Sequence, residues 1–408
     1  MKTVKSLLTV ILICLIFVNG CGSGDGQTGR NPENSSSLRV SGSSSKDKET
    51  ASSKGSELRK LVEEKRNGED LPEKTDIVQN SSLYDPEKRE EIISESEGFY
   101  NKLNQGEDVN ILINGDSIGA GAGSKDGSSW TDLLKNYIEE KYSVSCNMTN
   151  ISLGGNSSYA GYVMENMPDL KPSYDLMIIC YGENDSDKHI AADYEAMIRS
   201  ALKRYPSLNM ISILESSQRE YTKKMEKIME LSEYYDIRVA DTIAAFNESG
   251  RDYDDLTVDI KHPNDEGYRL YFETVKEVID RECNNDTGVE KIERMPLLNE
   301  VEDYNNIRIF KAEEFVRSNE KTYVLPLNET IGGVIGLYHL YCPSNGEILI
   351  RSNGKEVIRR SMVWANDFDQ YFIYRADNNT HSISKDLEIT FPTAEMADGF
   401  KGFIISYK

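Results

Sequence analysis

The stretch VNILINGDSIG (residues 109–119) joins a short apolar run to a turn of small polar residues. VNILI is typical of a buried strand, whereas Gly115, Asp116 and Ser117 are residue types that are common in turns. A glycine-rich segment follows and leads into a helical pattern. Because open parallel sheets bind ligands at the carboxyl ends of their strands, the stretch predicts a site at Ser117. Turn chemistry alone would explain the same residues equally well.

Apolar strand-like runs alternate with helical patterns throughout residues 106–283, which we take as one domain. Trp130, Leu134 and Ile138 recur at helical spacing, and Ser129 precedes them as a candidate N-cap. The alternation predicts a three-layer α/β/α domain with a mostly parallel sheet. After the first strand, we expect strands at 144–152, 174–181, 208–216 and 236–241, and helices at 128–142, 191–205, 222–235 and 264–283.

The pattern changes after a linker at 284–303, and residues 304–408 contain eight short strand-like runs separated by turn residues. One turn contains Asn353 and Gly354, a pair that strongly favours a β-hairpin. Short strands at this density predict an all-β sandwich or jelly roll. The aromatic residues of this domain are open to two interpretations, a sugar-stacking surface or the core of the sandwich; they are Trp364, Phe368, Tyr371 and Tyr374.

The N-terminus has the pattern of an export signal. Lys2 and Lys5 precede a twelve-residue apolar run at 7–18, which is short for a membrane span and typical of a signal peptide. The run ends in VNGC, which resembles the lipobox of bacterial lipoproteins. We therefore expect residues 1–21 to direct export and Cys21 to carry lipid, anchoring the protein outside the cytoplasmic membrane. The alternative is an ordinary signal peptide that is cleaved near Gly20.

The next segment, residues 22–82, is rich in Ser, Gly, Lys and Glu and has almost no aromatic residues, which predicts a disordered tether. Residues 83–105 then lead into the first domain. The formal net charge of −22 argues against nucleic acid as a partner, because phosphate binding needs clustered Lys and Arg. The cysteines match no zinc pattern, and no glycine-rich nucleotide motif is present.

A serine hydroxyl attacks efficiently only when a neighbouring base accepts its proton. His262 lies just before the last predicted helix of the α/β domain, so it can reach the same edge of the sheet as Ser117. Asp259 lies three residues upstream and can hold the other imidazole nitrogen. Acyl transfer also needs donors for the developing oxyanion. The Gly-rich turn LGGNSS (153–158) offers backbone amides, and Asn184 offers a side-chain amide.

Taken together, these stretches resemble the SGNH (GDSL-like) hydrolase family. The blocks occur in the family's order and cover about 106–283; they are GDSIGAG (115–121), NISLGGNSS (150–158), GEND (182–185) and DIKHPNDEGY (259–268). The resemblance implies that Ser117 is the nucleophile, His262 the base and Asp259 the acid that orients it. It also implies an oxyanion hole formed by the amide of Ser117, the amide of Gly155 and the side chain of Asn184.

These expectations describe a surface-anchored serine esterase that removes O-acetyl or other short acyl groups from carbohydrate, without a cofactor or metal. A lipase, a thioesterase, an O-acyltransferase and a non-catalytic glycan-binding lipoprotein remain alternatives. Two further residues, Glu183 and His189, are candidate substrate contacts because they flank the presumed oxyanion donor. We expect an acylated carbohydrate or another ester as substrate, membrane attachment through lipid, and no obligate protein partner.

Overall fold

The computed structural model describes residues 98–285, 306–364 and 366–407. The predicted signal peptide, the tether, and most of the lead-in segment and of the linker lie outside these residues. Among the helices of the described residues, none combines the length and the apolar character that crossing a membrane requires.

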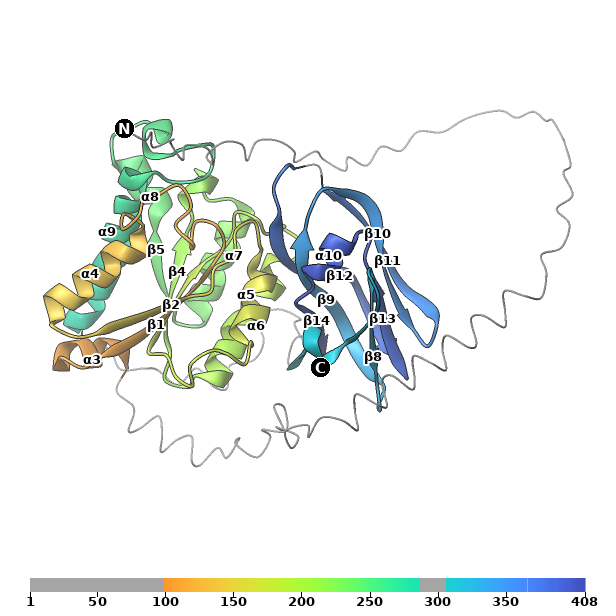
Figure 1. Ribbon diagram of the computed structural model, residues 1–408. Helices are drawn as coiled ribbons and strands as arrows, with labels where there is room; N and C mark the ends of the chain where they lie inside the picture. The colour runs from red at the N-terminus through yellow and green to blue at the C-terminus, as the bar shows by residue number, and fades with distance from the viewer. Residues whose placement is uncertain (1–97, 286–305, 365, 408) are drawn as a thin grey trace, which may run out of the picture. The chain divides into compact units, whose positions relative to one another are not determined.

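The N-terminal half of the described chain is built on a five-stranded parallel sheet with the strand order β2-β1-β3-β4-β5 (Figure 1). Strand order reverses between β1 and β3, so the first strand of the chain lies inside the sheet. Its strands are β1 (Val109–Gly115), β2 (Cys146–Asn150), β3 (Leu176–Cys180), β4 (Asn209–Leu214) and β5 (Arg238–Asp241).

Helices cover both faces of this sheet, which gives the predicted three layers (Figure 1). Successive residues of a strand point to opposite faces. Accordingly, Ile111 and Ile113 join one apolar core, whereas Leu112 joins the other. The first core also includes residues of α3 (Phe99–Gln105), α4 (Trp130–Tyr142) and α9 (Asp265–Asn285). The second includes residues of α5 (Ser158–Glu165), α6 (Ile190–Arg204) and α7 (Lys223–Tyr234).

The C-terminal residues form two antiparallel sheets with the orders β11-β10-β13-β8-β7 and β12-β9-β14-β6. Their apolar residues share one core, since Ile350 of the first sheet and Phe403 of the second belong to the same cluster. The strands are β6 (Asn306–Lys311), β7 (Val316–Asn319), β8 (Thr322–Pro326), β9 (Ile331–Tyr341), β10 (Ser344–Ser352), β11 (Lys355–Trp364), β12 (Gln370–Ile383), β13 (Asp386–Thr390) and β14 (Gly402–Tyr407).

The predicted fold class, an α/β/α domain followed by an all-β domain, is confirmed. Ser129 caps α4 as expected, because its hydroxyl accepts a hydrogen bond from the amide of Asp132. The sequence patterns missed several short elements: strand β7 and the helices α5, α8 (Thr242–Glu248) and α10 (Ala394–Asp398). The pattern does not predict helix α5 because seven of its eight residues are buried, so it lacks the polar face of an amphipathic helix.

Candidate active site

Three neighbouring strands end in polar residues that form the site. Asp116 and Ser117 follow β1, Asn184 follows β3, and Glu215 follows β4. Because the strands are parallel, their carboxyl ends meet at one edge of the sheet. This edge includes the point between β1 and β3 where strand order reverses, which is where open α/β sheets bind ligands.

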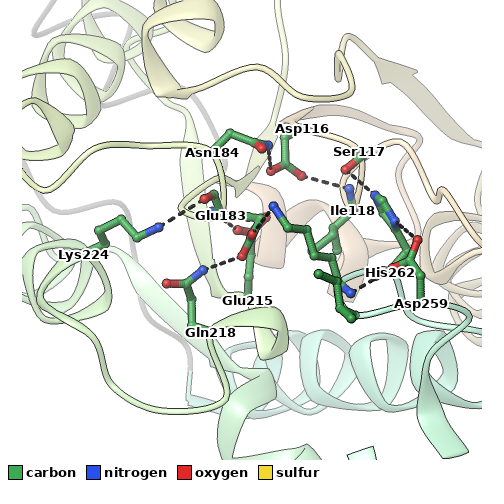
Figure 2. Close-up of polar contacts among 12 residues, drawn as sticks. Asp116, Ser117, Ile118, Glu183, Asn184, Glu215, Gln218, Lys224, Asp259 and His262 are labelled. Carbon is green, nitrogen blue, oxygen red and sulfur yellow. Dashed lines mark hydrogen bonds and ion pairs between the residues drawn. The ribbon is translucent and has the colours of Figure 1, made fainter. Parts of the chain in front are cut away.

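His262 connects Ser117 to Asp259 at this edge (Figure 2). Its Nε2 lies 2.8 Å from Oγ of Ser117, and its Nδ1 lies 2.8 Å from Oδ2 of Asp259. These are hydrogen-bond distances, and they give the imidazole one partner on each nitrogen. The structure thus brings together the three residues that were predicted to act as nucleophile, base and acid.

The loop that carries Asp259 and His262 is held in a tight turn by its own acid. The other carboxylate oxygen of Asp259 accepts hydrogen bonds from the amides of Lys261 and His262, at 2.8 and 2.7 Å. Partial burial opposes ionisation of Asp259, but these amides and the imidazole outweigh it and hold the pKa of Asp259 below its usual value. The acid therefore remains a carboxylate that can orient the imidazole near neutral pH.

The glycine-rich segment after Ser117 allows this loop to come close. Gly123 has a φ of +98°, and a Cβ placed there would lie 2.6 Å from the carbonyl oxygen of Pro263 and 3.3 Å from Cβ of His262. A larger residue at Gly123 would thus displace the histidine. Of the glycines in this segment, Gly123 is the one that packs against the His262 loop, since a Cβ at Gly121 would meet Ser129 instead.

The turn Leu153–Asn156 carries the predicted backbone donor. It is closed by a hydrogen bond of 3.2 Å from the amide of Asn156 to the carbonyl of Leu153, and Gly155 lies within it at a φ of +70°. In the described chain, no hydrogen bond to another residue occupies the backbone amides of Gly155 and Ser117. Both amides can therefore donate to a bound group.

Asn184 is fixed by a buried acid that the sequence reading treated only as a turn residue. Its Nδ2 donates to Oδ2 of Asp116 at 2.7 Å, and the amide of Ile118 donates to Oδ1 at 2.8 Å (Figure 2). One N–H of the Asn184 side chain is thereby used for orientation, which leaves the other for a ligand. Asp116 thus connects the nucleophile segment to the predicted side-chain donor.

Asp116 and Glu215 form a buried pair of acids beneath the site. Burial raises the pKa of Asp116 to about 7, against the lowering effect of the hydrogen bond from Ile118. Burial also raises the pKa of Glu215 well above its usual value, and the nearby charge of Asp116 raises it further. Two like charges are unfavourable in this buried environment, so the pair favours the state in which Glu215 holds a proton.

Glu183, a candidate substrate contact, has partners within the protein. Its Oε1 lies 2.6 Å from Nζ of Lys261, and Nε2 of Gln218 donates to Oε2 at 2.6 Å. Only 12% of the side chain is exposed. Both carboxylate oxygens therefore have partners within the protein, and local sequence could not indicate them because they come from other loops.

His189, the other candidate substrate contact, precedes α6, and its backbone amide donates to the carbonyl of Ser186 at 3.0 Å. Partial burial, followed by the charges of Arg375 and Lys188, lowers the pKa of His189 to about 4. In the described chain no hydrogen bond connects its ring to Ser117. His189 is therefore neutral at physiological pH, and its role as a substrate contact stays a prediction.

Strand β12 of the C-terminal domain contacts the glycine turn, which the sequence did not suggest. Buried Asn156 donates to the carbonyl of Gly154 at 2.9 Å and to that of Tyr371 at 3.1 Å, and it accepts from the amide of Ile373 at 2.8 Å. The side-chain amide of Gln370 also donates to the carbonyl of Gly154. The backbone donor of the site is thus braced by a strand from another domain.

The aromatic residues of the β-domain divide between the two interpretations. Tyr374 belongs to the interior, since its hydroxyl lies 2.7 Å from Nε2 of buried His339. Trp364 makes edge contacts with Phe368 and Phe372 and is only partly buried.

No group of three potential metal ligands occurs in the described residues.

Comparison with known proteins gives a family for the α/β domain. Residues 113–270 match the GDSL-like Lipase/Acylhydrolase family. The comparison with curated proteins gives no match.

Two solved structures resemble both domains together. A two-domain esterase (CEX) active on acetylated mannans, co-crystallised with mannopentaose, is 14% identical with a TM-score of 0.59; the match covers 79% of this chain and 96% of the esterase. A second structure of a two-domain esterase (CEX) active on acetylated mannans is 17% identical with a TM-score of 0.56, covering 75% and 93%. At these identities the likeness shows a shared two-domain fold.

Proposed function

We propose that the GDSL-like lipase/acylhydrolase domain formed by residues 113–270 makes this protein a serine esterase that removes acetyl groups from carbohydrate. The observation that carries this proposal is the position of His262, which lies 2.8 Å from both Ser117 Oγ and Asp259 Oδ2. A serine with a base and an orienting acid in this geometry is suited to acyl transfer.

In the first half of the reaction, Ser117 attacks the ester carbonyl while His262 accepts the proton of the hydroxyl. Asp259 orients the imidazole and stabilises its charged form. The negative charge that develops on the carbonyl oxygen is stabilised by the amides of Ser117 and Gly155 and by Nδ2 of Asn184. The C–O bond of the ester then breaks, and His262 donates its proton to the departing alcohol.

The second half repeats these steps with water. His262 removes a proton from a water molecule, the resulting nucleophile attacks the acyl-enzyme, and the same donors stabilise the second oxyanion. Collapse of this intermediate returns the proton to Oγ of Ser117 and releases acetate. An acyltransferase would use the same acyl-enzyme but would admit a sugar hydroxyl in place of water.

The substrate class is supported by the two-domain architecture. The two structures that match most of this chain are described as esterases active on acetylated mannans. In this chain, the β-domain places Gln370 at the glycine turn and holds the partly buried Trp364 and Phe372 in one aromatic cluster. An oligosaccharide next to the nucleophile would therefore meet polar and aromatic groups.

The test is release of acetate from acetylated mannan by the full chain, compared with the Ser117→Ala variant. We expect the wild type to release acetate and to hydrolyse p-nitrophenyl acetate faster than the octanoate ester, and Ser117→Ala to fall to background. Equal turnover by Ser117→Ala would refute the nucleophile assignment. A preference for chains longer than about eight carbons would favour a lipase instead.

We further propose that the protein acts outside the cytoplasmic membrane as a lipoprotein attached through Cys21. The support is the sequence of residues 1–21, with two lysines, a short apolar run and a small residue before the cysteine. The mass of the N-terminal peptide from detergent-extracted protein should include covalent lipid. Cys21→Ser should remove that mass and release the protein from membranes, whereas an unmodified Cys21 would exclude the anchor.

A further inference from the structure

Each polar atom of Glu183 has a partner elsewhere in the α/β domain, and Figure 2 shows this network. Its backbone amide donates to Oε2 of Glu215 at 2.6 Å, and its carbonyl accepts from Nζ of Lys224 at 3.1 Å. Its two carboxylate oxygens bind Gln218 and Lys261, each at 2.6 Å. A loop residue with four such contacts has little conformational freedom.

The positions of two of these residues in the sequence connect the network to the reaction. Glu183 directly precedes Asn184, and Lys261 directly precedes His262. We propose that Glu183 and Lys261 are positioning residues, whose ion pair joins the loop of the side-chain oxyanion donor to the loop of the base. This inference rests on the proposed function, because both residues act through groups that the esterase mechanism uses.

Direct connection between the two loops matters because they come from distant parts of the chain. Asn184 follows β3, whereas His262 follows β5 and α8, and each must keep its distance from the oxygen that becomes charged. Asp259 fixes the His262 loop internally, and Asp116 fixes the Asn184 side chain. The Glu183–Lys261 pair is the contact that spans both loops, and misplacement by about 1 Å can cost roughly 10²-fold in rate.

The charge of Lys261 has a second consequence. Several acids surround the oxyanion site, among them Glu183, Asp185 and Asp116, and an unpaired carboxylate there would oppose a developing negative charge. Lys261 pairs with the least buried of these three. Removing Lys261 alone leaves the Glu183 carboxylate without its cation. This should slow the reaction more than removing both charges does.

The test compares Lys261→Met, Glu183→Gln and the double variant in acetate release from acetylated mannan and p-nitrophenyl acetate. Lys261→Met should lower kcat roughly tenfold and leave KM within about twofold, because the substrate contacts are unchanged. The double variant should be faster than Lys261→Met, and Lys261→Arg should restore most of kcat. The matched control is Glu230→Gln, which removes an exposed Lys–Glu pair on α7 and should match the wild type.

A double-mutant cycle separates positioning from a general structural effect. In an Asn184→Ala background, Glu183→Gln should cause a smaller loss of kcat than in the wild type, since only its effect through the His262 loop remains. Full additivity, or wild-type kcat in Lys261→Met, would overturn the inference. If the wild type itself releases no acetate, the proposed function fails instead.

Amide hydrogen exchange provides a readout that does not depend on activity. In Lys261→Met, peptides covering both 181–185 and 259–264 should exchange faster, because the contact between the two loops is lost. Peptides of β4 and α4 should be unchanged, which also shows that the variant is folded. Unchanged exchange in both loops would overturn the inference even in an inactive protein.

Discussion

Gly155 and Asn184, the two donors that we propose for the oxyanion besides Ser117, are held in different ways. Gly155 lies in a turn that is braced by neutral amide groups, the side chains of Asn156 and Gln370, and part of that bracing comes from β12 of the second domain. Asn184 is held by acids of its own domain, directly by Asp116 and through the preceding residue by Glu215. One donor depends on domain packing, and the other depends on buried charge.

This difference determines what can disturb each donor. Neutral hydrogen bonds such as those of Asn156 do not titrate, so the glycine turn should be insensitive to pH but sensitive to any change in β12. The Asn184 loop has the opposite character, because the charge of Asp116 and the proton on Glu215 decide its hydrogen bonding. Variants of the glycine turn and of the Asn184 loop can therefore separate the effect of domain packing from the effect of buried charge.

The largest effect is expected from Asn184→Ala, which removes a donor outright. We expect kcat to fall by ~10²–10³ with little change in KM, because the lost hydrogen bond forms only as charge develops. Steady-state kinetics on p-nitrophenyl acetate measures this. A loss confined to KM would instead make Asn184 a substrate-binding residue.

A smaller loss is expected from Asn156→Ala, which leaves the Gly155 amide in place but removes three hydrogen bonds around it. We expect kcat to fall roughly tenfold and the free energy of unfolding to fall by about 2–4 kcal/mol. The matched control is Asn166→Ala, which loses contacts to Tyr162 and Ser200 at the C-terminal end of α5. It should lose stability without losing kcat. Equal kcat values for both variants would show that β12 does not support the donor.

The same contrast explains how much of the site the sequence could predict. Ser117, Asn184 and His262 can be predicted as site residues because each lies in a short block directly after a strand or before a helix, where the local pattern indicates position. The same holds for Gly155, the predicted backbone donor. The three-layer fold can be predicted from the alternation of strand-like and helical patterns. Within a strand, neighbouring residues such as Ile111 and Leu112 face the two different cores.

The supporting residues could not be found in this way, because their roles arise from contacts distant in sequence. Gln370 lies 216 positions from Gly154 and belongs to a strand pattern that indicates only a sandwich. Glu215 reads as the polar end of an apolar strand, and nothing local distinguishes a protonated acid from an exposed one. Glu183 was assigned to substrate because its partners, Gln218 and Lys261, come from separate loops.

A further effect concerns stability alone, which depends on pH through the buried acids Asp116 and Glu215. Glu215 is protonated when folded but ionises in water after unfolding, so the unfolded state binds fewer protons above the usual carboxyl pKa. Stability therefore falls as pH rises from about 4, and for Asp116 it falls up to its raised pKa of about 7. In this window, each acid lowers the free energy of unfolding by up to about 1.4 kcal/mol per pH unit, which corresponds to roughly 2–4 °C in Tm.

Glu215→Gln removes the titration of this residue, while its side-chain oxygen can still accept from the amide of Glu183. Thermal unfolding followed between pH 5 and 7 should therefore show a shallower fall of Tm in this variant than in the wild type. Glu230→Gln, which removes an exposed acid, should keep the wild-type slope. Asn156→Ala should keep it as well, because it removes only neutral hydrogen bonds at the glycine turn. If Glu215→Gln also kept that slope, Glu215 would be ionised in the folded protein, and charge repulsion with Asp116 would have to be offset by another cation.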